Sequence, residues 1–332
     1  MIGYYVHHAG TGHLNRARAV AARTDVDVTG LSSLPAPPGW PGPWVRLDRD
    51  DRAADVVDPT GRGNLHWVPA GDEGLRRRMT QISAWLEDAR PDVVVSDVSA
   101  EVTLLVRLHG VPVVSVVLPG RRGDRAHRSA HAVSSELVAA WPRQATGMVH
   151  GLKSVDARRL HHVGAVSRLD VASSAAHPPG RRTVLVLSGS GGGHPARTQV
   201  DAAAADAPDW SWRILGGDGE WTDDPASAID GADVVVIQAG ESAVADVAAR
   251  RRPAVVVPAA RPFDEQRTTG RVLAMAEWPA RVEECFPSAG WSERLEHVAT
   301  LDGRAWQRWC DGHAADRMTE LLMSFRAQRR TA

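Results

Sequence analysis

The chain has 332 residues, a formal net charge of −1 and two cysteines. The length favours two domains, each large enough for its own core, and the near-zero charge gives no reason to expect a nucleic-acid partner. Cys285 and Cys310 lack metal-ligand spacing, so we expect free thiols and a reducing, cytoplasmic location. We also expect neither a signal peptide nor a membrane-spanning helix.

The first half of the chain alternates between strand and helix patterns. Residues 2–6 predict a strand, 7–13 a loop, 14–22 a helix and 26–29 a strand, whereas residues 35–75 are rich in Pro, Gly and Asp and predict loops. A helix over 75–86, a buried strand over 92–96, a helix over 101–108 and a strand over 112–117 follow. This order indicates βαβ units around a parallel sheet.

The second half repeats that order after a small, Pro-rich segment. We expect strands over 183–187, 212–215, 233–237 and 254–257, a Gly-rich loop over 188–194, a helix over 198–205 and an amphipathic helix over 313–328. The sequence thus predicts an α/β protein with two Rossmann-like domains facing each other across a cleft. The expected divisions are an N-terminal domain over 1–171, a linker over 172–182, a C-terminal domain over 183–312 and a helix over 313–332 that crosses back to the N-terminal domain.

Polar groups follow the strands of the second half. Glycines in the loop 188–194 offer clustered backbone N–H groups, and the helix start after residue 240 offers more, which suits a phosphate. One turn further lies Asp246, placed for ribose hydroxyls, and Glu265 with Gln266 can hold a sugar. These groups predict a nucleotide-sugar site at the carboxyl edge of the sheet. The alternatives are a flexible glycine turn, an N-cap by Ser242 and a solvated Asp246.

The first loop of the chain carries a histidine at a helix start. Gly10 and Gly12 permit a tight turn, and neutral His13 can take a proton from a hydroxyl group. A histidine that only packs or caps the helix is the alternative. Asn15 replaces the third glycine of a dinucleotide fingerprint, so the pattern for a nicotinamide cofactor is weak. Asp97 ends a buried strand and either faces the cleft or caps the next helix.

Two further patterns were weighed as ligand sites. Metal spacing can be drawn among His7, His8 and His13, but no carboxylate or cysteine neighbour completes a set, so we expect no metal. The arginines of residues 121–128 suit an anionic acceptor or a membrane surface, and a solvated loop is the alternative.

Taken together, these residues resemble the GT-B glycosyltransferases, most closely the MurG-like group that adds N-acetylglucosamine to a lipid-linked precursor. The loop 188–193 looks like the phosphate loop of that family, and residues 240–258 look like its SGA-x-T-x-x-E segment with the following strand. Asp246 corresponds in position to the family's ribose-binding glutamate, and Glu265 and Gln266 correspond to the pair that holds the donor sugar. Residues 221–224 resemble the segment that contacts the base. Residues 10–13 look like the family's G-T-G-G-H loop with one glycine missing, which places the proposed general base at His13.

The resemblance implies an inverting, metal-independent glycosyltransferase without a cofactor, which uses a UDP-sugar and releases UDP. The donor-binding residues that it predicts are Ser188, Gly189, Ser190, Gly191, Gly192, Trp221, Thr222, Gly240, Glu241, Ser242, Asp246, Glu265 and Gln266. The acceptor side would comprise Gly10, Thr11, Gly12 and Asp97.

Other functions remain open at this stage. One is a nucleotide-sugar hydrolase or hydrolysing epimerase of the same shape, and another is a nucleotide-sugar-binding protein without turnover. A nicotinamide-dependent dehydrogenase is a third. The sequence identifies neither the hydroxyl acceptor nor the nucleobase, and it leaves open a peripheral contact with the inner face of the membrane.

Overall fold

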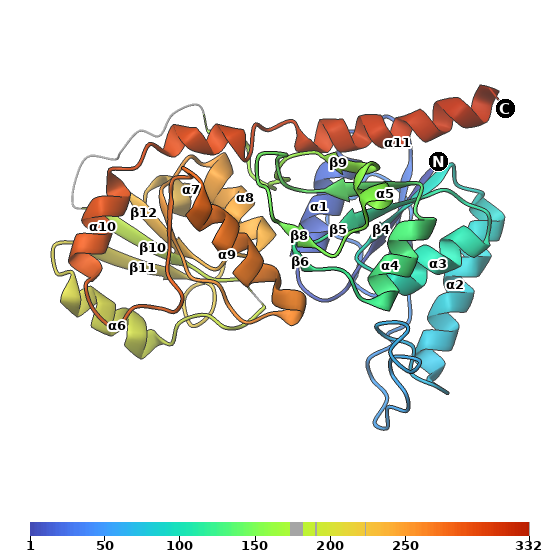
Figure 1. The fold of residues 1–332 in the computed structure, drawn as a ribbon, viewed down its shortest axis with the longest axis horizontal. Coiled ribbons are helices and arrows are strands. Elements are labelled where there is room, and N and C mark those ends of the chain that lie inside the picture. Colours follow the sequence, from blue (N-terminus) through green and yellow to red (C-terminus); the bar gives the residue numbers. More distant parts are fainter. Residues whose placement is uncertain (173–181, 190, 223, 332) are drawn as a thin grey trace.

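The computed structural model describes residues 1–172, 182–189, 191–222 and 224–331. Two α/β lobes lie side by side, and a long C-terminal helix runs from the second lobe along the first (Figure 1). Most of the predicted linker, residues 173–181, lies outside the described residues, as does Ser190. Within the described residues, no helix is both long and apolar enough to span a bilayer.

The first lobe is built on a parallel sheet of seven strands in the described residues. Its order is β3 (Trp44–Arg46), β2 (Val28–Ser32), β1 (Ile2–Val6), β4 (Val93–Asp97), β5 (Val113–Val117), β7 (Glu136–Ala139) and β9 (Leu160–His162). A small parallel pair, β6 (Gly120–Arg121) with β8 (Val149–His150), lies beside it. The helices of this lobe are α1 (Gly12–Ala21), α2 (Glu73–Ala89), α3 (Ala100–Leu108), α4 (Arg125–Val133) and α5 (Ser154–Ala157).

Over its described residues, the second lobe repeats the design with five parallel strands. Its order is β11 (Ser211–Leu215), β10 (Thr183–Leu187), β12 (Val234–Ile237), β13 (Ala254–Val256) and β14 (Ala280–Val282). Its helices are α6 (Arg197–Asp206), α7 (Ala226–Asp230), α8 (Glu241–Ala249), η1 (Pro262–Asp264), α9 (Glu265–Met275), α10 (Trp291–Ala299) and η2 (Gly303–Arg308). The predicted α/β class and paired Rossmann-like lobes are therefore confirmed.

Strand order explains where a site forms. In each lobe the chain changes direction between two central neighbours, β1 and β4 in the first and β10 and β12 in the second. Connections leave these two strands in opposite directions, so a crevice opens at their carboxyl ends, where open α/β sheets bind ligands. The central strands β1, β4 and β12 are buried along their whole length, as the near-continuous apolar runs predict. The short strands β3, β6, β7, β8, β9 and β14 were not predicted.

The C-terminal helix α11 (Ala314–Thr331) packs on the first lobe. Met318 and Leu322 are buried in the same cluster as β1 and α1, and Thr319 Oγ1 lies 3.4 Å from the carbonyl of Val20. Its apolar face thus completes the core of the N-terminal lobe, although the helix follows the C-terminal lobe in sequence.

Candidate active site

His13 lies on the first turn of α1 and is held by a buried carboxylate. Its Nδ1 is 2.9 Å from Oδ1 of Asp97, the last residue of β4. The side chains are 17% and 0% exposed, respectively. Because β1 and β4 pair in the sheet, their carboxyl ends bring together two residues that are 84 positions apart. Asp97 does not cap the next helix, since Ser99 fills that role for α3.

Asp97 is surrounded by donors. Arg16 approaches both of its oxygens, with Nε at 3.0 Å and a terminal nitrogen at 3.1 Å, and the Tyr4 hydroxyl lies at 3.2 Å. Burial opposes ionisation, but the charges of Arg16 and His13 and their hydrogen bonds hold the pKa of Asp97 well below its usual range. An ionised carboxylate only accepts hydrogen bonds, so neutral His13 carries its proton on Nδ1 and keeps a lone pair on Nε2. The 3.5 Å contact of Arg16 with the same Nδ1 is then not a hydrogen bond, because both nitrogens carry a proton. This is the arrangement of a general base and the group that orients it.

The turn after Asp97 is strained. Val98 has a φ of +78°, which is rare for a β-branched residue, and its N–H bonds the Ser96 carbonyl at 3.1 Å. Such a conformation costs about 1–3 kcal/mol and persists only where the surrounding structure enforces it. The strain therefore marks the strand end that carries the carboxylate.

The two lobes touch beside this pair. A terminal nitrogen of Arg16 lies 3.2 Å from Oε2 of Glu241, the first residue of α8. A Cβ added to Gly12 would lie 2.7 Å from Oγ of Ser242, so the starts of α1 and α8 are in close contact. Gly240 is the N-cap of α8, so the alternative of an N-cap by Ser242 is wrong.

Glu241 is an unusual group for this position. Its side chain is 14% exposed, and its Oε1 is buried without a hydrogen-bond partner among the described residues. Burial raises the pKa of Glu241 to about 7; Arg16 opposes the rise, and the nearby Glu265 and Asp97 add to it. A carboxyl group that changes charge near neutral pH thus lies at the contact between the lobes.

The Gly-rich loop after β10 is tied to its neighbours. The carbonyl of Gly192 accepts from Gln238 Nε2 at 3.0 Å and from Arg261 at 2.8 Å. Gly192 and Gly193 both have a left-handed φ, of +75° and +72°, which favours glycine. These bonds argue against a merely flexible turn. A Cβ on Gly191 would lie 2.9 Å from the Arg261 guanidinium, so that glycine is packed closely as well.

Asp246, on the second turn of α8, is buried rather than solvated. One of its oxygens accepts from the Ser167 hydroxyl at 2.8 Å, and the other lies 3.2 Å from Nε of Arg168. Both partners come from the segment that leaves the N-terminal lobe. The interpretation as a solvated helix carboxylate is therefore wrong, while the ribose contact remains a prediction that would require one of these partners to move.

The predicted sugar-binding pair also has protein partners. Glu265 lies 3.4 Å from a terminal nitrogen of Arg122 in the other lobe, and Gln266 Oε1 accepts from the Ala259 N–H at 2.9 Å. Arg122 is only 2% exposed, so the interpretation of residues 121–128 as a solvated loop fails at this position. Both predicted residues lie beside the contact between the lobes.

A large cavity separates the lobes on the side of α11. Its volume is about 1210 Å³. The N-terminal lobe contributes Thr11, Leu14 and Asn15 to its lining, and the C-terminal lobe contributes Ser188, Gly189, Trp221 and Thr222. Trp221 is 64% exposed, so its ring is available for stacking. Four of the predicted donor residues thus line one cavity, whereas His13, Asp97 and Glu265 are not part of its lining.

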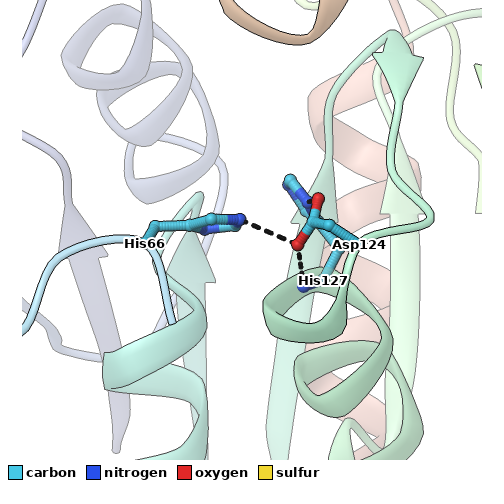
Figure 2. Close-up of side chains that lie close together, drawn as sticks. All are labelled: His66, Asp124 and His127. Atoms are coloured by element: carbon cyan, nitrogen blue, oxygen red, sulfur yellow. Dashed lines mark hydrogen bonds and ion pairs between the residues drawn. The ribbon is translucent and has the colours of Figure 1, made fainter. Parts of the chain in front are cut away.

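A second histidine and aspartate cluster lies at the start of α4, and its members have the spacing of metal ligands (Figure 2). His66 Nε2 is 3.1 Å from Asp124, and His127 Nδ1 also bonds Asp124. Arg122 lies 3.3 Å from His127 Nε2 and can only donate there, which fixes the proton of His127 on Nδ1. A metal on Nδ1 would move that proton to Nε2, facing the guanidinium. The hydrogen bonds of this cluster are therefore complete without an ion.

A similar group, His8 with Asp50 and Asp51, is the other candidate among the described residues. Arg49 bonds Asp51, and Arg78 lies 3.6 Å from Asp50, so two cations already neutralise these carboxylates. Neither cluster was predicted, because His66 is 58 residues from Asp124 and His8 is 43 residues from Asp51 in the sequence.

Comparison with solved structures decides the fold. MurG of Acinetobacter baumannii aligns over 97% of this chain and 99% of its own, with a TM-score of 0.59 and 18% identity. The glycosyltransferase of kitacinnamycin aligns over 99% and 98%, with a TM-score of 0.63 and 15% identity. The spinosyn rhamnosyltransferase SpnG, complexed with thymidine diphosphate, aligns over 100% of this chain and 99% of its own, with a TM-score of 0.59 and 16% identity. The chain has the GT-B fold. A scan of protein-family profiles and a search of curated proteins found no match.

In GT-B terms, the predicted site residues lie on facing edges of the two lobes. Sequence reasoning did not find Arg16, Ser167 or Arg168, which hold the predicted carboxylates. For Arg16 a signal was present, because it lies three residues after His13 and therefore on the same face of α1. For Ser167 and Arg168 the sequence carries no local signal, since their partner is 78 or more residues away.

Proposed function

We propose that this chain is an inverting, metal-independent glycosyltransferase, which transfers a sugar from a pyrimidine nucleoside diphosphate sugar to a hydroxyl acceptor. UDP is the first choice of carrier, as the resemblance implies. Thymidine diphosphate is the second, because SpnG and the Streptomyces enzyme SsfS6 were both solved with it. The observation that carries the proposal is the His13–Asp97 pair at the carboxyl edge of the N-terminal sheet.

In the mechanism, His13 Nε2 accepts the proton of the acceptor hydroxyl as the oxygen attacks the anomeric carbon. Asp97 keeps His13 in the required tautomer and stabilises the imidazolium that forms. The diphosphate leaves from the opposite face of the sugar, which inverts the anomeric centre. Backbone N–H groups of the loop 188–193 and of the α8 N-terminus would stabilise the leaving charge in place of a metal ion.

The cavity between the lobes supports the placement of the nucleotide. Trp221 and Thr222 would lie against the base and Ser188 and Gly189 near the diphosphate. Asp246 does not line the cavity, but its partners Ser167 and Arg168 do, so a ribose contact of Asp246 would require one of them to move. Glu265 and Gln266 would hold the sugar, and residues 10–12 would line the acceptor side.

The first test is binding, with UDP, dTDP, GDP, ADP, NAD and NADP compared by thermal shift in EDTA. A ligand that binds the folded state raises the melting temperature, so we expect shifts with UDP or dTDP alone. The second test is turnover, measured as release of nucleoside diphosphate from the sugar donors across a panel of hydroxyl acceptors. Release of free sugar without any acceptor would instead indicate a hydrolase. A rise in melting temperature with NAD or NADP alone would contradict the proposal. So would the absence of a rise with every nucleotide tested.

A further inference from the structure

The ion pair between Arg16 and Glu241 is a contact that the proposed reaction does not use. Arg16 belongs to α1 in the N-terminal lobe, and Glu241 opens α8 in the other. The two side chains are 7% and 14% exposed, respectively. A buried ion pair is weak evidence for stability, because removing two charges from water costs as much as their attraction returns. The position of the Arg16–Glu241 pair at the contact between the lobes is therefore not explained by stability alone.

Glu241 occupies a place that suits an anion. Side chains on a helix point toward its N-terminus, so a carboxylate on the first residue lies by the free N–H groups of that end. The start of α8 is also where the proposed function puts the donor diphosphate. Two anions at one helix end would repel each other strongly in a buried site, so the carboxylate and the diphosphate compete for the same positive surroundings.

Arg16 can change partners without disturbing His13. Its Nε and one terminal nitrogen bond the two oxygens of Asp97, and only the other terminal nitrogen bonds Glu241. If that third nitrogen leaves Glu241, the bonds that hold Asp97, and through it His13, remain in place.

We infer that Glu241 is an internal competitor of the donor: its carboxylate holds Arg16 in the empty protein, and a donor diphosphate takes its place as the partner of Arg16. This inference rests on the proposed function. It assigns Arg16, a residue of the acceptor lobe, to the donor diphosphate, and it makes protonation of Glu241 part of donor binding. The charged groups that face Glu241 are Arg16 on α1, Asp97 on β4, Glu265 on α9 and Arg122 after β6.

The raised pKa of Glu241, about 7, sets the pH range of the effect. If only the protonated form admits the donor, the apparent affinity falls with the protonated fraction of the empty protein. That fraction drops about tenfold between pH 6 and pH 8, and at pH 8 donor binding takes up close to one proton.

The test is calorimetric titration of the full chain with UDP-glucose and dTDP-glucose at pH 6, 7 and 8. Both phosphates of these probes are esterified, so the probes themselves do not titrate in this range. Wild type should lose about tenfold in affinity from pH 6 to pH 8, whereas Glu241→Gln should bind with nearly constant affinity. The exposed Glu293→Gln on α10 is the matched control and should behave as wild type.

Proton uptake provides a measurement that needs no variant. Titrations of wild type at pH 8 in two buffers of different ionisation enthalpy give the number of protons bound, which should approach one. In Glu241→Gln, a further change of Arg16 to Lys should weaken binding by at least about tenfold, since a charge-assisted hydrogen bond to phosphate is lost.

The outcomes separate the two proposals. Binding by wild type without proton uptake, or an equal pH dependence in wild type and Glu241→Gln, would overturn this inference and leave the proposed function intact. If neither UDP-glucose nor dTDP-glucose binds at any pH, both this inference and the proposed function are overturned.

Discussion

The buried carboxylate of Asp97 provides the sharpest test of the site, because its replacement by asparagine removes one charge and almost no volume. Arg16 would then keep only Glu241 as an ionic partner. Removing one member of a buried ion pair costs about 3–5 kcal/mol. Because Arg16 keeps its contact with Glu241, we expect a cost near the lower end of this range. We therefore expect Asp97→Asn to lower the free energy of unfolding of the N-terminal lobe by about 3 kcal/mol.

For a lobe of this size, 1 kcal/mol corresponds to a change of about 2–4 °C in melting temperature, so Asp97→Asn should melt roughly 6–12 °C lower in calorimetry. The pKa of Asp97 is lower in the folded than in the unfolded chain, so its contribution is present above the unfolded pKa and is lost as the pH falls through the folded value. The difference between wild type and Asp97→Asn should therefore shrink in acid.

Two further variants control this measurement. Asp201 pairs with Arg197 at 2.9 Å on the surface, where both side chains are more than half exposed, so Asp201→Asn should cost at most about 1 kcal/mol. The double variant Asp97→Asn with Arg16→Met should regain part of the loss, because no buried guanidinium stays without Asp97, and Glu241, whose pKa burial already raises to about 7, can take up a proton when Arg16 is gone. A loss below about 1 kcal/mol, or strict additivity in the double variant, would refute the reasoning.

The remaining predictions concern single groups of the site. His13→Ala should lower turnover by about 10²–10⁴-fold with donor affinity retained, as kcat and a binding titration would report; unchanged turnover would remove His13 from the mechanism. Asp246→Ala should weaken nucleotide binding in calorimetry, and equal affinity would move the ribose contact elsewhere. For Glu241, the folded pKa of about 7 exceeds the ordinary value of 4.5, so the folded state holds a proton that the unfolded chain lacks between these values. Stability should therefore fall by up to about 3 kcal/mol as the pH rises from 4.5 to 7. Urea titrations should show a flatter profile for Glu241→Gln, and parallel profiles would contradict this.

Much of the architecture was predictable because it depends on local patterns. Valine runs such as 93–95 identify buried parallel strands, and polar residues that end them, such as Asp97, mark the carboxyl edge where ligands bind. The two lobes followed from the repeated order of strand, glycine loop and helix. The strands β3, β6, β7, β8, β9 and β14 were missed because segments of two to four residues carry too few positions for a periodicity.

The partners within the site were not predictable, because they depend on how the chain packs. The bond from His13 to Asp97 exists only because β4 is placed beside β1, which no local pattern specifies. The same holds for Asp246, for which the sequence favoured a ribose contact over a solvated helix carboxylate, and which is bonded by Ser167 and Arg168 at the end of the other lobe. An N-cap by Ser242, the alternative to a phosphate site at this turn, is wrong because Gly240 is the N-cap of α8.

The chain passes between the lobes twice, and the two passages run side by side. The segment leaving the first lobe bonds the one returning to it: the Ala165 N–H donates to the Trp309 carbonyl at 3.0 Å. Gly312 is packed against Val171, since an added Cβ would lie 2.9 Å from its side chain. Two adjacent backbone segments that are bonded to each other would restrict relative motion of the lobes mainly to rotation about an axis through this pair of segments. The lobes would then separate most at the edge far from these two connections, so a substrate would enter from that side only. Deleting residues just before α11 would remove one of the two connections that limit this motion.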